Sequence, residues 1–276
     1  MYPIIEFFHI TIGTYGICCV LGGGLAILLA LFNCKYSKLN RYDLIEAAAL
    51  IILGAIIGAK LLYLMVDFDT VQFMFQEYGF NSDTLLNVMQ GGFVFYGGFF
   101  GGLLAAFLYA KSQKKSLWLY LMTIAPGIPL AHAFGRMGCF MAGCCYGIPS
   151  EEFGIAFTHS LGAPNGIKLF PVQLLESALL LLLALIMQIY YTRSKHHHGV
   201  IYLYLFIYPV IRIITEQFRY DDAERGIFLG LSTSTWISIG IFVAGLVILL
   251  MDRKKGFPEP EISADDPIRL KEAKSE

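Results

Sequence analysis

The sequence predicts an all-α polytopic membrane protein, and two observations support that fold class. Hydrophobic residues make up 57% of the 276 residues and charged residues only 15%, whereas soluble domains carry about 25% charged residues. Long apolar runs also recur along the chain, and a helix needs about 20 such residues to cross the ~30 Å hydrocarbon layer. The net charge of −1 provides no basic field, so we expect no nucleic-acid partner.

About seven of these runs are candidates for transmembrane helices. Six are clear, at residues 15–32, 44–66, 93–110, 172–191, 200–215 and 236–251. The seventh, at 117–134, contains Pro126 and Pro129. Because proline frees a carbonyl group that neighbours or water must then satisfy, we predict that this helix is broken.

The segment 67–90 is too polar to span the membrane, although it is rich in aromatic residues. It predicts an irregular outer-face element that lies on the membrane interface, and a solvated connecting loop is the alternative. The aromatic residues are Phe68, Phe73, Phe75, Tyr78 and Phe80.

Basic residues in the short loops predict the orientation, because cytoplasmic loops are enriched in lysine and arginine. Four loops carry such residues, at 35–41, 111–115, 193–195 and 253–255, and we expect all four in the cytoplasm. Seven spans then place the N-terminus outside and the C-terminus in the cytoplasm. Residues 256–276 contain prolines and mixed charges, which predicts a disordered cytoplasmic tail after a single transmembrane domain at 1–255.

The segment 132–147 is the main candidate site, because it places a fixed cation among four glycines. Arg136 stays charged at physiological pH and is costly at membrane depth, so it needs an anionic partner or a water-filled cavity. Glycines allow the backbone to approach a ligand closely. We therefore expect a loop folded around a phosphate head group, on the outer face. The glycines are Gly135, Gly138, Gly143 and Gly147.

Other charged residues are predicted at membrane depth. Glu176 lies about one turn into the fifth span, where a carboxylate requires a cation. Arg212, Glu216 and Arg219 have the spacing i, i+4 and i+7, so they form one stripe that should face the bundle interior. This stripe is either a structural ladder of ion pairs between helices or, at its outer end, part of a clamp in which Arg219 and Arg136 hold one phosphate.

Three cysteines in the candidate segment, Cys139, Cys144 and Cys145, lie close to His132 and His159. Their spacing matches no common zinc template, so we expect neither a metal nor a cofactor. A disulfide is chemically permitted on an oxidising outer face, but the two adjacent cysteines could not both close onto Cys139.

Two tyrosines, Tyr15 and Tyr96, lie in predicted helices next to glycines, and Gly97 and Gly98 follow Tyr96 directly. Such glycine pairs allow close helix packing. A tyrosine hydroxyl among apolar residues still needs a partner. Each tyrosine could therefore bond a head group, take part in proton transfer, or serve aromatic packing only.

These residues carry a resemblance to a known family. The segment 135–147 resembles the signature of the phosphatidylglycerol:prolipoprotein diacylglyceryl transferases, in the form that contains cysteines. Supporting matches lie at 15–16, 96–98, 171–176, 212–219 and 230–238. The resemblance implies a seven-span protein of the bacterial inner membrane whose catalytic domain is 1–255.

The resemblance also implies a reaction and a set of site residues. Diacylglyceryl would move from phosphatidylglycerol to the thiol of a lipobox cysteine in a prolipoprotein signal peptide, which leaves a thioether and releases glycerol phosphate. Tyr96 stands where better-known members carry a histidine, Cys139 where they carry an asparagine, and Cys144 where they carry a glutamate, so the general base stays open. The implied catalytic residues are Arg136, Arg219 and Tyr96, and the implied substrate-binding residues are Tyr15, Gly97, Gly98, Gly138, Cys139, Gly147, Glu176 and Glu216.

Elementary chemistry agrees with this reaction. Cleavage of a carbon–oxygen bond with a phosphate leaving group is helped by cations aimed at the growing charge, a role that suits Arg136 and Arg219. The acceptor thiol needs only deprotonation to attack. Two alternatives remain: a related transferase with another acceptor or donor, and a transporter or lipid-binding protein whose charged stripe lines a path. Arginines clustered near one face favour the enzyme over the transporter.

Overall fold

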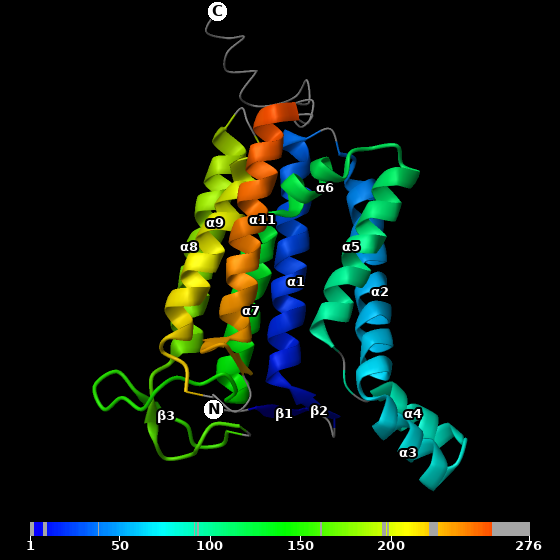
Figure 1. Cartoon of the computed structure of the whole chain (residues 1–276), viewed down its shortest axis with the longest axis vertical. Helices are drawn as coiled ribbons and strands as arrows, with labels where there is room; N and C mark the ends of the chain where they lie inside the picture. The colour runs from blue at the N-terminus through cyan, green and yellow to red at the C-terminus, as the bar shows by residue number, and fades with distance from the viewer. Residues whose placement is uncertain are drawn as a thin grey trace, which may run out of the picture. The chain divides into compact units, whose positions relative to one another are not determined.

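The computed structural model describes residues 3–7, 10–37, 39–90, 92, 94–160, 162–194, 197, 199–220 and 226–255 (Figure 1). It divides into two compact units, the first formed by residues 1–38 and 121–276 and the second by 39–120. The predicted tail at 256–276 lies outside the described residues.

Long helices of the first unit pack side by side in a regular order. α7 packs between α1 and α8, and α9 packs between α8 and α11 (Figure 1). The elements are α1 (Thr14–Asn33), α7 (Gly127–Ala142), α8 (Val172–Arg193), α9 (Gly199–Glu216) and α11 (Thr233–Lys255).

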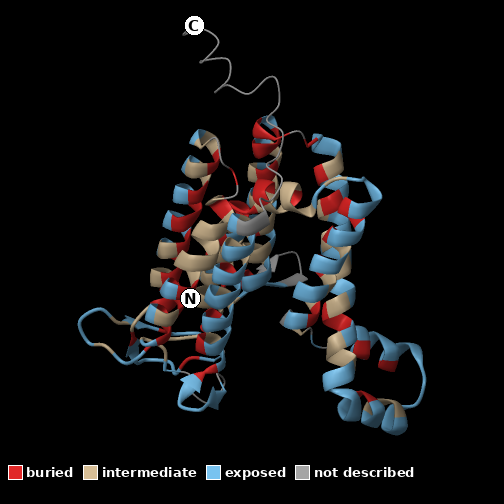
Figure 2. Cartoon of the chain, turned by 45° about the horizontal axis from the view of Figure 1, so that its top comes forward, coloured by how far each residue is buried: buried red, intermediate tan, exposed pale blue. Residues whose placement is uncertain are grey.

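The core of this unit follows one stripe of α8. Leu180, Leu183, Met187 and Tyr191 are spaced three or four residues apart and are fully buried, because residues at this spacing share one helix face. Leu181, Leu182 and Leu185, on the opposite side of the helix, are exposed. Figure 2 shows the same division, with buried residues on the inner sides of helices and exposed ones outside. An apolar outer surface of this kind is suited to contact with lipid chains.

The predicted break in the seventh run is confirmed. α6 (Leu117–Ile124) and α7 are bent by 48° at the interruption that contains Pro126. Asn33 at the end of α1 donates a 3.1 Å hydrogen bond to the backbone carbonyl of Thr123. A neighbouring helix thus supplies a partner at the break, as the membrane environment requires.

The predicted glycine loop around Arg136 is wrong for most of its length. α7 continues through Arg136 to Ala142 and ends only at Gly143, whose φ of 76° is left-handed. The backbone N–H groups of Gly143 and Cys144 donate to the carbonyl of Cys139 at 2.9 Å and 3.1 Å, which closes the helix end. Gly138 lies inside the helix because α1 crosses close to it, so this glycine permits packing rather than a turn.

Short antiparallel strand pairs connect the helices of the first unit. Figure 1 shows β1, β2 and β3 at the end where α1 begins and α7 ends. The pairs in the described residues are β1 (Ile4–Phe7) with β2 (Ile10–Gly13), β3 (Ile155–Ala156) with β4 (Lys168–Leu169), and β5 (Ile227–Phe228) with β6 (Leu231–Ser232).

The second unit is built on two helices that pack through glycines, α2 (Arg41–Val66) and α5 (Phe95–Ser112). The Asn40 side chain caps α2 by accepting a hydrogen bond from the Tyr42 N–H, as an N-cap asparagine does. A Cβ atom on Gly54 or on Gly58 would lie within 2.7 Å of backbone oxygens of α5. The close crossing therefore requires the glycines.

The predicted irregular segment at 67–90 contains two short helices, α3 (Phe68–Tyr78) and α4 (Ser82–Gln90). The left-handed Gly79, with a φ of 74°, ends α3. Phe68, Phe73 and Phe80 are exposed. Phe68 and Phe73 thus lie on the surface of a folded helix, and Phe80 lies in the short turn between α3 and α4.

The helices agree with a polytopic membrane protein. Within the described residues, five helices are long and apolar enough to cross a membrane, and the bent pair of α6 and α7 makes six if it is one span. α5 has 18 residues and coincides with the predicted run 93–110. The five helices are Thr14–Tyr36, Arg41–Val66, Val172–Arg193, Gly199–Glu216 and Thr233–Arg253, of which the first includes the 3-10 turn η1 (Cys34–Tyr36).

Candidate active site

Three arginines and two glutamates form a continuous chain of ion pairs in the first unit. Arg136 on α7 places Nε 3.1 Å from Glu176 Oε2 on α8. The same oxygen accepts a 3.0 Å hydrogen bond from Nη1 of Arg212 on α9. Arg212 Nη2 lies 2.8 Å from Oε2 of Glu216, and Arg219 Nη1 lies 3.6 Å from that oxygen. The ladder of ion pairs between helices, one of the two alternatives for the stripe on α9, is therefore present.

The ion-pair chain is buried. Side-chain exposure is 13% for Arg136, 9% for Arg219 and 6% or less for the other three residues. Within the part of the chain that the structure describes, three guanidinium groups are paired with two carboxylates. Because buried charge is costly unless it is paired, this arrangement favours the binding of an anion.

Arg212 differs from the two arginines at the ends of the chain. It contacts both carboxylates, and its Nη2 donates a 2.9 Å hydrogen bond to Ser234 Oγ on α11. Arg136 contacts Glu176 and Arg219 contacts Glu216. The central arginine therefore ties α8, α9 and α11 together, while the terminal arginines are the better placed to receive a ligand.

Arg219 lies beyond the end of α9, and the backbone holds it there. It forms an antiparallel bridge with Gly147, and hydrogen bonds of 2.9 Å and 3.1 Å join segments 146–148 and 218–220 on either side. A Cβ atom on Gly147 would lie 2.4 Å from the carbonyl oxygen of Phe170. The predicted site residue Gly147 thus positions Arg219 through the backbone, since no other residue would fit.

Tyr15 and Gly138 meet where α1 crosses α7. A Cβ atom on Gly138 would lie 3.0 Å from Cδ2 of Tyr15 and 3.2 Å from Cβ of Cys18. Gly138 stands between Arg136 and Cys139 in the sequence, so the tyrosine ring packs against the segment that carries both. Tyr15 remains 48% exposed, which leaves its ring open to a ligand.

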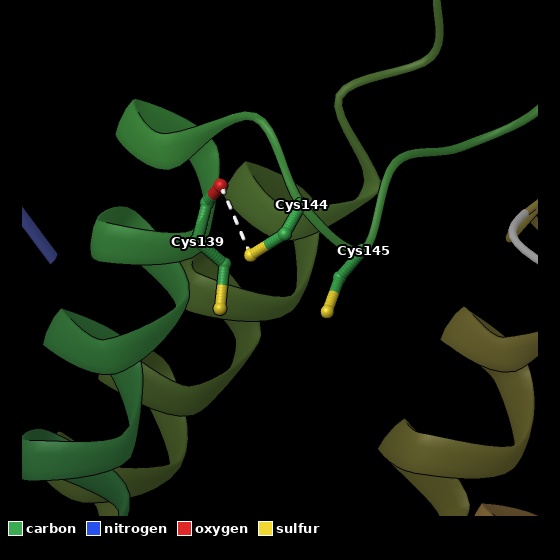
Figure 3. A group of neighbouring side chains, drawn as sticks. All are labelled: Cys139, Cys144 and Cys145. Carbon is green, nitrogen blue, oxygen red and sulfur yellow. Dashed lines mark hydrogen bonds between the residues drawn. The ribbon is translucent and has the colours of Figure 1, made fainter. Parts of the chain in front are cut away.

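The three cysteines of the segment converge. Cys139 lies in the last turn of α7, and Cys144 and Cys145 follow the turn at Gly143. Their sulfur atoms all lie within 4.8 Å of one another, and the side chains turn to the same side (Figure 3). The thiol of Cys144 donates to the carbonyl oxygen of Cys139 at 3.7 Å. All three are free thiols of intermediate exposure.

Cys145 has an unusual environment. Hydrogen bonds from the thiols of Cys139 and Cys144, together with the positive charges of Arg219 and Arg136, lower the pKa of Cys145. Its backbone is left-handed, with a φ of 57°, which is uncommon for a residue other than glycine. The positive charges of Arg136 and Arg219 therefore act on Cys145 in the cysteine cluster.

Tyr96, Gly97 and Gly98 lie in the first turns of α5 in the second unit. A Cβ atom on Gly97 would lie 2.2 Å from the carbonyl oxygen of Gly58, whereas one on Gly98 would lie 3.3 Å from that of Ala55. The predicted packing role is confirmed for Gly97. Tyr96 is 42% exposed.

His132, the first residue of the candidate segment 132–147, and Ser234, which sequence reasoning did not assign to this site, also contact the chain of ion pairs. His132 Nε2 lies 4.0 Å from Glu176 Oε1, an oxygen that accepts no hydrogen bond from the residues that the structure describes. The i, i+4 spacing of His132 and Arg136 on one helix face could have indicated this neighbour. Ser234 had no such signal, because its contact with Arg212 depends on the packing of α11.

Comparison with known proteins agrees with this geometry. The family model described as "Prolipoprotein diacylglyceryl transferase" matches residues 3–251. The chain belongs to this family.

Several relatives with similar sequences are named as transferases of this kind. A Clostridium tetani protein named "Phosphatidylglycerol--prolipoprotein diacylglyceryl transferase" is 35% identical over 256 residues, which cover 92% of this chain and 98% of the relative. A Clostridium perfringens protein with that name and the number 2 is 32% identical over 259 residues, covering 92% and 96%. A Clostridium botulinum relative is 30% identical over 225 residues, covering 79% and 85%.

Membership in the prolipoprotein diacylglyceryl transferase family gives the site a chemical context. The family's name describes the transfer of a lipid-derived group to a protein precursor. Within the first unit, Arg136, Glu176, Glu216 and Arg219 are joined by direct contacts or by Arg212. A buried cationic cluster of this kind can bind an anionic group and stabilise negative charge that grows on it.

Proposed function

We infer that this protein transfers the diacylglyceryl group of phosphatidylglycerol to a cysteine thiol of prolipoproteins, the first step of lipoprotein maturation. The family and the names of the relatives support this transferase activity. The structural observation that carries the proposal is the buried chain that three arginines and two glutamates form among the described residues. Such a cluster suits a phosphodiester head group, which is an anion.

We assign the phosphate to Arg136 and Arg219, the two ends of the chain. The leaving group is glycerol phosphate, whose oxygens gain negative charge as the carbon–oxygen bond breaks, and fixed cations stabilise that charge. Glu176 orients Arg136 and Glu216 orients Arg219 through their ion pairs. Because Arg212 already holds both carboxylates, the cationic groups are in place before the lipid binds, which limits the entropic cost of binding.

The remaining site residues receive supporting roles in this proposal. Tyr15 and Gly138 form a wall for the lipid where α1 crosses α7, and Gly147 sets the position of Arg219. Cys139 follows Gly138 in the sequence, and we assign it to substrate binding. For Tyr96 we keep the role that the family resemblance implies, on the head group or the proton. Gly97 and Gly98 place the first turn of α5, which carries Tyr96.

We also propose a location and an orientation. The five apolar helices, the bent pair and α5 together make seven spans, with the N-terminus outside and the C-terminus in the cytoplasm. The protein then lies in the bacterial plasma membrane, with 1–255 as one catalytic domain and the site toward the outer face. Lipid and the lipobox signal peptide of the prolipoprotein both reach the site from the membrane.

The test is a transfer assay in detergent or liposomes with phosphatidylglycerol and a lipobox peptide. We expect glycerol phosphate release that depends on the peptide thiol and falls about 10²–10³-fold in Arg136→Gln, the loss typical of a removed charge-stabilising donor. Arg193→Gln is the matched control, because Arg193 is an exposed arginine in the last turn of α8. Equal release by both variants, or none by a folded wild type, contradicts the proposal.

A further inference from the structure

The cysteine cluster, Cys139, Cys144 and Cys145, has the dimensions of a metal site. A zinc–thiolate bond is about 2.3 Å long, so two thiolates on one tetrahedral zinc lie roughly 3.8 Å apart. The three sulfur atoms lie within 4.8 Å of one another and turn to one side (Figure 3). Small side-chain rotations therefore suffice to bring all three onto a single ion.

The loop that carries two of these thiols is held in place from several directions. Gln173 Nε2 on α8 donates a 2.8 Å hydrogen bond to the carbonyl oxygen of Cys144. The carbonyl oxygen of Gly143 accepts from Ser160 Oγ at 3.1 Å and from the N–H of Ala163 at 2.8 Å. Hydrogen bonds behind the ligands orient them and raise the affinity of a metal site. The loop that carries Cys144 and Cys145 is thus held in place by hydrogen bonds, as expected of a metal site.

The donor set selects the kind of metal. Thiolates are soft ligands that favour zinc and monovalent copper over magnesium, calcium or manganese. Three protein ligands with an open fourth position are the arrangement of catalytic zinc, whereas structural zinc sites are closed by four. Cys144 and Cys145 are of intermediate exposure and Cys139 is the most enclosed of the three, so a substrate atom can complete the tetrahedron from the side of Cys144 and Cys145.

The cluster also lies beside the proposed phosphate site. Cys139 follows Arg136 by three residues on α7, so the two share one helix face. Gly147, two residues after Cys145, forms the backbone bridge that positions Arg219. A ligand held by the sulfurs would therefore lie next to the cationic groups.

We propose that Cys139, Cys144 and Cys145 bind one Zn²⁺ through their thiolates and that the fourth position takes the acceptor thiol of the prolipoprotein. This inference rests on the proposed transferase function. A thiol that coordinates zinc is deprotonated outright, and the acceptor must become a thiolate to attack. The metal thus delivers the nucleophile while the arginines hold the leaving group.

The step balances without an oxidant or reductant. The acceptor thiol gives its proton to solvent when its sulfur binds zinc. The sulfur lone pair then forms a carbon–sulfur bond with the glyceryl carbon that carries the phosphate. The bond from that carbon to the phosphate oxygen breaks, and its electron pair leaves with glycerol phosphate. The thioether product is neutral and leaves the zinc, because a thioether is a weaker ligand than a thiolate.

Cobalt substitution tests the site without relying on activity. The full-length protein, purified in detergent and depleted of metal, is titrated with cobalt(II) chloride while thiolate-to-cobalt charge-transfer absorption is recorded. We expect one Co²⁺ per chain, loss of the band in Cys139→Ser, Cys144→Ser and Cys145→Ser, and an affinity about 10–100-fold lower in Gln173→Leu, as for other outer-shell partners. Cys34→Ser is the control, because Cys34 lies buried in η1, outside the cluster.

The fourth ligand is tested with two peptides. A lipobox peptide should change the cobalt spectrum, and the same peptide with serine in place of the cysteine should not. Size-exclusion profiles show that each variant is folded. A wild type without the charge-transfer band, a band that survives all three cysteine substitutions, or a disulfide between two of the three cysteines in the purified active enzyme overturns the proposal.

The activity assay separates this inference from the function on which it rests. We expect glycerol phosphate release to fall at least about tenfold on metal depletion and to return with zinc. Full release by the metal-free enzyme overturns the zinc proposal and leaves the transferase function intact. Cobalt binding by a folded enzyme that releases no glycerol phosphate supports the metal site and contradicts the proposed function.

Discussion

The substitution Glu176→Gln tests whether the chain of ion pairs holds the first unit together. It keeps the shape of the side chain but removes the negative charge that lies 3.1 Å from Arg136 Nε and 3.0 Å from Arg212 Nη1. The side chain of Glu176 is only 2% exposed, so water cannot replace the lost charge. Removing one partner of a buried ion pair costs about 3–5 kcal/mol.

This cost predicts a large fall in thermal stability. For a chain of this size class each kcal/mol lowers the melting temperature by about 2–4 °C, so we expect a fall of about 6–20 °C. The measurement is thermal unfolding of the purified protein in detergent, followed by size-exclusion chromatography. Glu151→Gln is the matched control, because Glu151 is 94% exposed and pairs with Lys168 at 3.5 Å. A surface pair contributes at most about 1 kcal/mol.

A double-mutant cycle shows whether the cost arises from the pair itself. Arg136→Gln should destabilise the wild type more than it destabilises Glu176→Gln, with a coupling of about 0.5–3 kcal/mol. If Glu176→Gln melts within the range of Glu151→Gln, the carboxylate is not a structural part of the unit. The reasoning from burial and contact distance would then be refuted.

Two further substitutions separate packing from chemistry in the other predicted site residues. Gly97→Ala should destabilise the protein by about 1–3 kcal/mol, the range of overpacking, because its Cβ would lie 2.2 Å from the Gly58 oxygen. Gly98→Ala should destabilise the protein less. Equal melting temperatures of the two variants would contradict the packing role of Gly97. Tyr96→Phe should lower kcat/KM for transfer about 2- to 12-fold, the equivalent of one hydrogen bond of 0.5–1.5 kcal/mol, and unchanged kinetics would remove its hydroxyl from the mechanism.

The helices could be predicted because their signal is local. A run of apolar residues long enough to cross a bilayer is a property of consecutive positions, and the run 172–191 accordingly matches α8. The break near Pro126 was predictable for the same reason, since proline removes a backbone donor wherever it stands. The pairing of Arg212 with Glu216 also follows from spacing alone, because residues four apart share a helix face.

The prediction failed where tertiary packing decides. Glycine has the same local signature in a loop and at a helix crossing, so the sequence could not show that Gly138 faces Tyr15 inside α7. The convergence of the three cysteines likewise depends on the turn at Gly143, because Cys139 lies on α7 and Cys144 and Cys145 follow its end. The contact between Arg212 and Ser234 joins residues of two helices that are 22 positions apart in sequence, and no local pattern predicts it.

The site forms where it does because of the alternation of helices in the first unit. α7 and α9 end, and α8 and α11 begin, at the same end of the unit (Figure 1), so Arg136, Glu176 and Arg219 are brought together from distant parts of the sequence. The charged residues of the site then differ in how many partners share them. The central charges are shared by three helices, whereas Arg136 and Arg219 each contact one glutamate of the ion-pair chain. An anion that binds to Arg136 and Arg219 meets side chains that folding has already positioned. This is the physical basis of preorganised charge stabilisation.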